Sequence, residues 1–426
     1  MKNLIALLGA GLLAIGASTL PIRSFADGDA GYVAHEWGTF TSVQGADGEQ
    51  LDWNPLNVSE LPKFVYDRNR RPGRTAVAAL SAGKTAFLCR QRLETPVIYF
   101  YSAQPRTVDV AVTFPSGTIT EWFPRDTPAA RNDRTAPALR WSGVQIVPRA
   151  GAAEGALPLE KSGSHYYAAR ETDSDFVRVA AGAECETEKF LFYRGVGNFD
   201  APLKVTSAET GGAALTLENC GKEELGILFV CEVRPPVADS GPQFVVTFQR
   251  IEKLPAGKVQ TVKLIGAASS EDSRSDLAAQ LRDALTAAGL YRAEAAAMVR
   301  TWEDSWLGEP GVRVLYILPR AWTDGILPLQ FTPAPRELSR VMVGRAEVLM
   351  PAAERALATE LQRFRSRDQG ERATAIGNIR ALGFGRFLEA AVRRFAATHS
   401  GDRELSNAGW QVLELASARP PVATHP

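Results

Sequence analysis

The chain has 426 residues, of which 45% are hydrophobic and 23% are charged. These fractions are ordinary for a globular protein with a buried core, and the length is enough for two or three domains. Lysine plus arginine and aspartate plus glutamate each number 48. The chain therefore lacks the basic excess by which proteins bind nucleic acids through bulk charge, and it is not a long disordered polyelectrolyte.

The N-terminus carries the pattern of an export signal. One lysine precedes an apolar run from Leu4 to Ala17, and Ser24-Phe25-Ala26 places small residues where a signal peptidase reads them. We expect residues 1–26 to be a signal peptide, with retention as an uncleaved anchor as the alternative. No later stretch is long and apolar enough to span a membrane. The predicted location is the periplasm or the extracellular space.

Residues 27–267 show the pattern of a β-rich domain. Val108, Val110 and Val112 alternate with more polar residues, which indicates a half-buried strand. Many short candidate strands follow, separated at short intervals by Gly, Pro, Asn and Asp. This punctuation favours an antiparallel sandwich. We therefore predict an α+β protein with a β-rich, antiparallel sandwich-like N-terminal part followed by a helical C-terminal region.

The pattern changes near residue 268. Leu277, Leu281 and Leu285 repeat every four residues, and a second apolar helical face follows a glycine. Residues 268–350 are therefore predicted to hold a helical hairpin plus short strands. Those strands either rejoin the first sheet or form a small sheet of their own.

Apolar stripes at helical spacing continue to the end of the chain. Ala353, Leu357 and Leu361 begin the first of them. Short helices joined by glycine-containing turns predict a helical, repeat-like region over residues 351–418, which packs on the preceding domain because it holds too few repeats to stand alone. Residues 419–426 are predicted to be a disordered tail.

The four cysteines allow two disulfides if the protein is exported to an oxidising compartment. Cys220 and Cys231 flank a predicted hairpin turn, which makes them the candidate disulfide, with buried free thiols as the alternative. No Cys-x-x-Cys occurs and the chain has only four histidines. The sequence therefore gives no support for a metal site, and we expect no cofactor.

The densest polar and aromatic stretch begins at His35. His35 and Glu36 offer a proton shuttle or metal ligands, and Asp52 adds a carboxylate, so these three are the catalytic candidates. Neighbours on a strand point to opposite faces, however, so His35 and Glu36 share a site only if a bulge intervenes. The alternative is that His35 or Trp37 is buried and hydrogen-bonded in the first strand.

Tryptophans repeatedly adjoin or lie close to acids, an arrangement that suits sugar rings, which stack on aromatic faces and donate hydroxyls to carboxylates. These clusters are Glu36-Trp37, Asp52-Trp53, Glu121-Trp122, Trp302-Glu303-Asp304 and Trp322-Thr323-Asp324. We take Trp37, Trp53 and His165 as binding candidates. Packing is the alternative for any tryptophan, and we expect Trp302 and Trp306 to be core because they lie on an apolar helical stripe.

Three segments carry a resemblance to known sequences. His35-Glu36-Trp37-Gly38-Thr39-Phe40, Glu94-Thr95-Pro96-Val97-Ile98-Tyr99-Phe100-Tyr101 and Lys189-Phe190-Leu191-Phe192-Tyr193-Arg194-Gly195 resemble segments of a family of uncharacterised exported bacterial proteins. The resemblance covers most of the chain after the signal. It implies a bacterial, exported protein, and it brings no activity with it because none is known for that family.

We therefore expect an exported protein that binds a glycan or a partner protein and does not bind nucleic acid. Neither a Gly-x-Ser-x-Gly elbow nor a His-Glu-x-x-His helix is present, so enzymatic activity stays undecided. One alternative is a hydrolase of an extracytoplasmic polymer centred on His35, Glu36 and Asp52. Another is a structural or assembly factor that docks through its helical end. Convergence of the three catalytic candidates in one open pocket favours the enzyme, and their dispersal favours binding or assembly.

Overall fold

The computed structural model describes residues 31–55, 61–68, 88–127, 138–151, 157–160, 163–208, 214–235, 244–263 and 273–417. The predicted signal peptide at 1–26 and the predicted tail at 419–426 lie outside the described residues. The described residues from Gly31 onward, with all the described helices and strands, belong to one compact unit.

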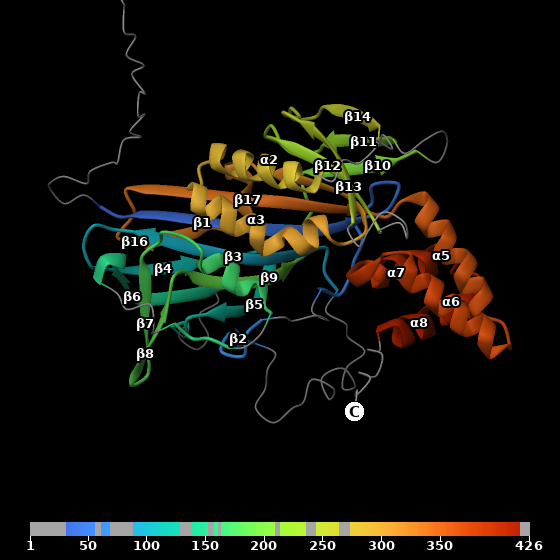
Figure 1. Ribbon diagram of the computed structural model, residues 1–426, viewed down its shortest axis with the longest axis horizontal. Coiled ribbons are helices and arrows are strands. Elements are labelled where there is room, and N and C mark those ends of the chain that lie inside the picture. The colour runs from blue at the N-terminus through green and yellow to red at the C-terminus, as the bar shows by residue number, and fades with distance from the viewer. Residues whose placement is uncertain are drawn as a thin grey trace, which may run out of the picture. The chain divides into compact units, whose positions relative to one another are not determined.

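A nine-stranded sheet is the centre of this unit (Figure 1). In spatial order its strands are β13 (Val245–Ile251), β12 (Leu228–Arg234), β15 (Gly311–Ile317), β17 (Glu337–Val348), β1 (Val33–Gln44), β3 (Gln91–Tyr101), β9 (Leu191–Gly197), β5 (Gly117–Phe123) and β2 (Tyr66–Asp67). β1 and β17 pair in parallel, and the other neighbours pair antiparallel. Of the strands predicted between residues 311 and 348, β15 and β17 therefore join the nine-stranded sheet near its middle, whereas the third, at 329–332, joins a smaller sheet.

Two smaller sheets cover one face of the nine-stranded sheet. The five-stranded sheet contains β16 (Leu329–Thr332), β4 (Arg106–Val112), β6 (Leu139–Val147), β7 (Phe176–Ala181) and β8 (Glu184–Glu188). The three-stranded sheet contains β10 (Leu203–Ser207), β11 (Ala214–Asn219) and β14 (Val259–Lys263). The alternating Val108, Val110 and Val112 join buried residues of β1 and β3 in one hydrophobic cluster, which we call the sheet core. The predicted α+β class with a sandwich-like N-terminal part is confirmed.

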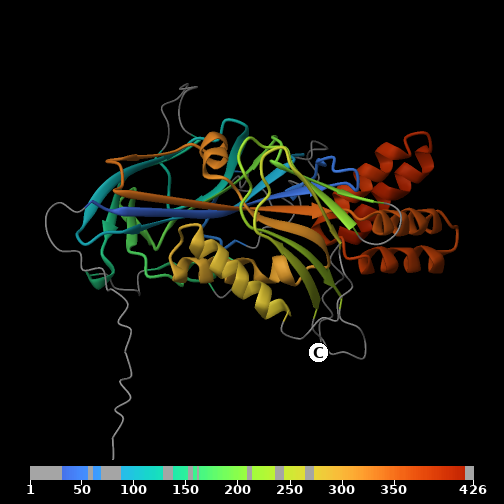
Figure 2. The ribbon, with the colours of Figure 1, turned by 90° about the horizontal axis from the view of Figure 1, so that it is seen from above.

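Helices cover the opposite face. They are α2 (Ser273–Ala287), α3 (Arg292–Leu307) and the 3-10 helix η4 (His165–Arg170). In Figure 2, α2 and α3 lie along one side of the central strands. Leu277, Leu281 and Leu285 share a second hydrophobic cluster with Trp302 and Trp306, so the predicted helical stripes do face a core. We call this cluster the helix-side core. Two further short helices are η2 (Arg149–Gly151) and α4 (Arg320–Ile326).

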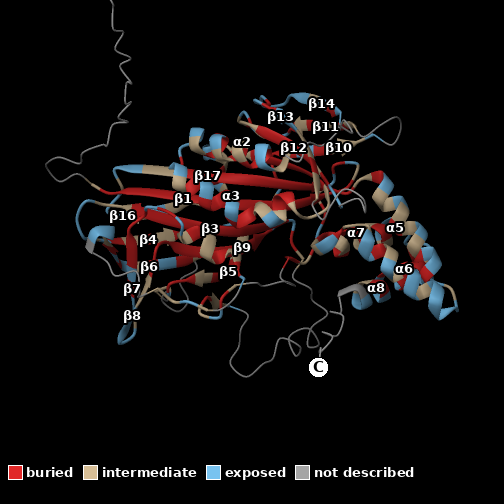
Figure 3. Ribbon diagram, in the orientation of Figure 1, coloured by how far each residue is buried: buried red, intermediate tan, exposed pale blue. Residues whose placement is uncertain are grey.

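The C-terminal helices form a third core. They are α5 (Pro351–Phe364), α6 (Gln369–Ala381), η5 (Gly385–Phe387), α7 (Leu388–Thr398) and α8 (Arg403–Ser417). Their buried Leu357 and Leu361 pack with Val43 at the end of β1 and with Leu349 just after β17. Burial is concentrated in the central strands, whereas the outer faces of these helices are exposed (Figure 3). Among the described residues, no helix is long and apolar enough to cross a membrane.

Candidate functional site

His35 and Glu36 lie on opposite faces of β1. Nδ1 of His35 lies 2.8 Å from Oε2 of Glu294 on α3, and both side chains are completely buried. The other oxygen of Glu294 accepts the hydroxyl of Tyr101 at 2.7 Å, while Oε2 also accepts the backbone N–H of Tyr291 at 2.7 Å. Glu294 thus caps the first turn of α3 and ties it to β1. This geometry gives His35 a structural partner on the helix side of the sheet.

Glu36 points into the other side. Its carboxylate accepts the Tyr193 hydroxyl, and it accepts Nε of Arg340 at 2.6 Å. Asp52 is exposed, and its carboxylate lies 3.7 Å from Nε of Arg90. The register shift in β1 falls between Trp37 and Thr39, beyond the His35–Glu36 step. The three catalytic candidates are therefore dispersed, which removes the geometric basis for a hydrolase centred on them.

The two tryptophan candidates are packing residues. Trp37 is fully buried in the helix-side core beside Tyr99. Trp53 is buried in the third core, where its ring lies 5.3 Å from that of Phe387. Neither presents an open face to a ligand. His165, the third binding candidate, lies on η4 and belongs to a charged region described below.

The predicted Cys220–Cys231 disulfide is not formed, because all four cysteines are free thiols. Cys220 follows β11 of the three-stranded sheet, whereas Cys231 lies in β12 of the nine-stranded sheet. The two therefore do not flank one hairpin, as the sequence had indicated. Cys231 is fully buried, and this burial raises the pKa of its thiol to about 12. Among the described residues, no group of three His, Cys, Asp or Glu side chains is placed to hold a metal.

A row of buried charges crosses the nine-stranded sheet on its helix side. We call it the charged belt: Arg92, Glu94, Glu121, Arg194, Arg313, Arg345 and Glu347, none of them more than 6% exposed. Cross-strand pairing aligns its members. Leu93 and Tyr193 point into the sheet core, so Arg92, Glu94 and Arg194, their neighbours along the strands, point to the helix side.

Backbone irregularities accompany the belt. Register shifts lie next to it on three strands, between Trp37 and Thr39, between Leu93 and Val97, and between Ile119 and Glu121. Thr95 has a φ of 49°, in the left-handed region that β-branched residues rarely occupy. Bulges re-aim side chains and occur often beside functional sites, where strained backbone is also concentrated. The belt is therefore the described region with the clearest local signs of a site.

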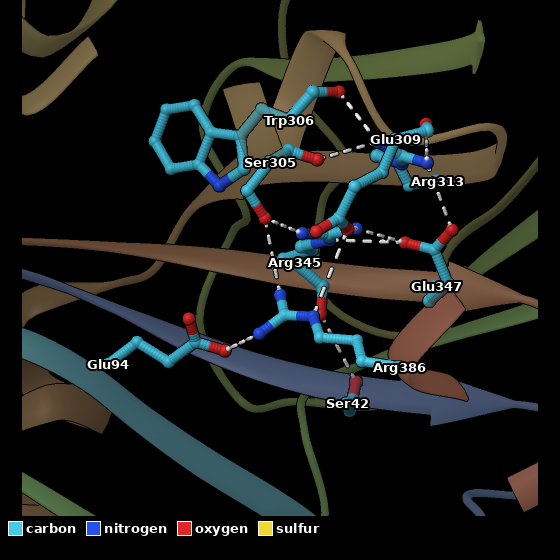
Figure 4. A network of polar contacts seen from close by, with 9 residues as sticks. All are labelled: Ser42, Glu94, Ser305, Trp306, Glu309, Arg313, Arg345, Glu347 and Arg386. Carbon is cyan, nitrogen blue, oxygen red and sulfur yellow. Dashed lines mark hydrogen bonds and ion pairs between the residues drawn. The ribbon is translucent and has the colours of Figure 1, made fainter. Parts of the chain in front are cut away.

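The C-terminal helical region contacts the belt through Arg386 of η5 (Figure 4). Nη1 of Arg386 donates to Glu94 at 2.8 Å, and its Nε lies 3.8 Å from Glu309. Arg345 donates to Ser305 at 2.5 Å and to Glu309 at 2.8 Å. The segment at the end of α3, which contains Ser305 and Glu309, therefore lies between two arginines from different parts of the chain.

The belt changes the protonation of two nearby groups. Burial alone would raise the pKa of Glu94, but Arg386, Arg92 and Arg194 outweigh it and lower that pKa to about 2. Burial, assisted by the positive charge of Arg194, lowers the pKa of His165 to about 4. Glu94 is therefore ionised and His165 neutral at neutral pH. His165 also contacts Trp302, with ring centroids 5.3 Å apart.

A separate open cleft lies beside β2. It has a volume of about 550 Å³, and its described lining is Lys63, Phe64, Val65, Tyr66, Asp67, Phe123, Pro158, Cys185, Glu186 and Thr187. We call it the aromatic cleft. The ring of Tyr66 stacks on Trp122 and Phe123, with centroids 6.2 and 6.4 Å away. The Tyr66 hydroxyl donates to Glu186 at 2.5 Å.

The sequence pattern indicates part of the charged belt and part of the aromatic cleft. The acid–tryptophan pair Glu121-Trp122 reaches both, because Glu121 belongs to the belt and Trp122 supports Tyr66. The three segments that carried the family resemblance contribute to β1, β3 and β9, which are neighbours in the sheet. Arg345 and Arg386 were missed, since nothing local in the sequence distinguishes them from surface arginines.

Comparisons with known proteins do not establish a family for this chain. No family model and no curated protein matches the chain. Among solved structures, the matches include the mu-homology domain of yeast delta-COP, alone and complexed with a Dsl1 WxWxV peptide. Each is 9% identical and covers 76% of this chain and 100% of that chain, with TM-scores of 0.30 and 0.29. TM-scores this low do not establish a common fold, so function is argued from the residues of this chain.

Proposed function

We propose that the protein is an exported binding protein and that it binds a glycan in the aromatic cleft. The observation that carries the proposal is the cleft itself, which is open and is lined by both aromatic rings and carboxylates. Its volume of about 550 Å³ falls in the range common for small-ligand sites, roughly 300–1,000 Å³.

The chemistry of the wall suits a sugar. The Tyr66 ring is partly exposed and is backed by Trp122 and Phe123, which hold its plane in place for a pyranose ring to stack on. The carboxylates of Asp67 and Glu186 lie in the same wall and accept hydrogen bonds from hydroxyls. Glu186 already accepts the Tyr66 hydroxyl and the backbone N–H of Arg125, so its orientation is set before a ligand arrives.

The cleft residues can be tested directly on a glycan array. We expect the wild type to bind at least one glycan and Tyr66→Ala to reduce its affinity at least tenfold with little change in melting temperature. Tyr291→Ala removes an exposed tyrosine outside the cleft lining and serves as the matched control. Equal binding by wild type and Tyr66→Ala would contradict the proposal. Capture of a protein that competes at Tyr66, with no glycan bound, would replace the glycan by a partner protein.

Export is a separate part of the proposal and has its own test. It is supported by the charged start, the short apolar run and the small residues at Ser24-Phe25-Ala26. Intact-mass measurement on protein purified from its native host should give a chain that begins at or near Asp27. A full-length chain recovered from the cytoplasm would contradict export and leave the cleft experiment unaffected.

A further inference from the structure

Near His165, the charged belt together with Arg386 holds more positive than negative charge, and we call this part of the network the centre. Three arginines, Arg92, Arg194 and Arg386, face two glutamates, Glu94 and Glu121, and these groups act on one another electrostatically. Beside them, Arg313 and Arg345 pair with Glu347 and Glu309 through contacts of 2.8 to 3.1 Å, so that part of the network is balanced. Among the described residues, the centre therefore has one positive charge in excess.

Arg194 leaves the most donors unsatisfied, because Arg313 and Arg386 each leave only Nε without a hydrogen-bond partner among the described residues. It is 4% exposed, and its Nε and Nη1 are buried with no hydrogen-bond partner among the described residues. A buried donor left unsatisfied costs about 1–3 kcal/mol, and more when it is charged. Native structures avoid that cost by means of a protein acceptor, an ordered water or a bound ion.

Further donors without partners lie around the same place. The hydroxyls of Thr39 and Thr41 are buried and unsatisfied, and these residues pair across β1–β3 with Glu94 and Arg92. The indole N–H of Trp302, which contacts His165, is buried and unsatisfied as well. Burial and the nearby Arg194 lower the pKa of Arg92 to about 10, as expected where cations outnumber anions. The unsatisfied hydrogen-bond donors and the excess positive charge would both be satisfied by a component that accepts hydrogen bonds and carries negative charge.

We propose that this centre binds one small monovalent anion, a halide or a short carboxylate, held chiefly by Arg194. One negative charge balances the excess. The ligand is small because the belt residues around it are at most 6% exposed, which leaves no open face for a polymer. The site is independent of the aromatic cleft, and it joins the sheet to η5, because Arg386 lies in the same charged group.

Anion dependence of stability gives the first test. Wild-type protein is exchanged into gluconate at fixed ionic strength, and chloride, bromide or acetate is then added while the melting temperature is followed. We expect a saturable rise, and calorimetric titration should give one site per chain. Arg194→Met should lose the response and weaken binding at least tenfold, whereas Arg178→Met, which removes an exposed arginine on β7, should keep it. A response to halide alone or to carboxylate alone identifies which of the two the site prefers.

Two outcomes overturn the proposal. One is a wild-type response that is not saturable, or that Arg194→Met shares in full, because salt then acts on the surface. The other is the absence of any response to all three anions in the wild type. If Arg194→Met does not fold, Arg194→Lys keeps the charge with fewer donors and should bind more weakly than the wild type. Line broadening of chloride-35 and acetate signals by the wild-type protein gives a readout that needs no variant.

Discussion

Two clusters of buried polar side chains lie on the helix side of the nine-stranded sheet, one around His35 and one around Arg194. They differ in how completely their charged groups are paired. In the first cluster, Nδ1 of the buried His35 meets Glu294, whose second oxygen accepts the Tyr101 hydroxyl, and only Nε2 of His35 is left without a hydrogen-bond partner among the described residues. In the second, Arg194 is also buried but leaves two guanidinium nitrogens without a partner among the residues that the structure describes. Only the second has a charge that the described residues leave uncompensated.

The comparison shows how a buried polar group can be interpreted. A carboxylate that caps a helix and binds a histidine explains the presence of both residues, because removing either leaves the other unsatisfied. A buried guanidinium with two nitrogens that lack an acceptor is not explained by packing, and it indicates a further component that accepts hydrogen bonds. The density of polar residues in the sequence predicts a site around His35, whereas the guanidinium nitrogens without hydrogen-bond partners indicate a site around Arg194.

The largest effect is expected from Glu94→Gln. This change removes one of the two carboxylates that face Arg92, Arg194 and Arg386, and leaves the arginines buried with less compensation. Breaking a buried ion pair from one side typically costs about 3–5 kcal/mol, and we expect a loss in that range by urea unfolding. Glu404→Gln removes an exposed carboxylate on α8 and should cost less than about 1 kcal/mol. Equal losses for the two variants would show that the belt is not electrostatically coupled.

His35→Ala should have the next largest effect. The change removes the partner of a fully buried carboxylate and leaves a void under α3, so the free energy of unfolding should fall by about 2–3 kcal/mol. His399→Ala, at an exposed histidine after α7, is the control for loss of an imidazole. Thermal melting measures both. An unchanged melting temperature for His35→Ala would remove the structural role assigned to that cluster and would reopen it as a site.

A smaller effect should appear in the pH dependence. The pKa of His165 is lowered from about 6.5 to about 4 in the folded protein, chiefly by burial. The unfolded chain therefore takes up a proton first as the pH falls, so stability should decrease by about 1–2 kcal/mol between pH 6.5 and 5. Over that window Glu94 stays ionised in the folded protein, because its pKa is about 2. Urea unfolding of His165→Gln should show a flatter profile, and a profile equal to that of the wild type would contradict the assignment.

The smallest effect concerns the reactivity of the thiols, which measures how deeply each cysteine is buried. Cys185 and Cys220 are exposed, whereas Cys89 and Cys231 are buried with the pKa of each raised to about 12. Under native conditions a thiol reagent should label the first two quickly and the other two only after unfolding. Peptide mapping without reduction should recover Cys220 and Cys231 as thiols, and a Cys220–Cys231 cross-link would show that these strands lie differently.

The sequence predicted the elements better than the site for a physical reason. Alternation at Val108–Val112 and the four-residue spacing of Leu277, Leu281 and Leu285 report which local face is buried, and both were confirmed. β1 has no such contrast, because all twelve of its residues are buried. The belt brings together positions 92, 194, 345 and 386 through strand pairing and helix docking, which local periodicity does not encode.

The parallel pairing of β1 with β17 also has a consequence for how the chain is made. Residues 33–44 lie in register with residues 337–348, so the middle of the sheet stays open until the ribosome has produced about four fifths of the sequence. Contacts this distant along the chain close slowly, and early strands remain exposed to chaperones or to aggregation in the meantime. The same delay predicts that fragments ending before β17 remain unfolded.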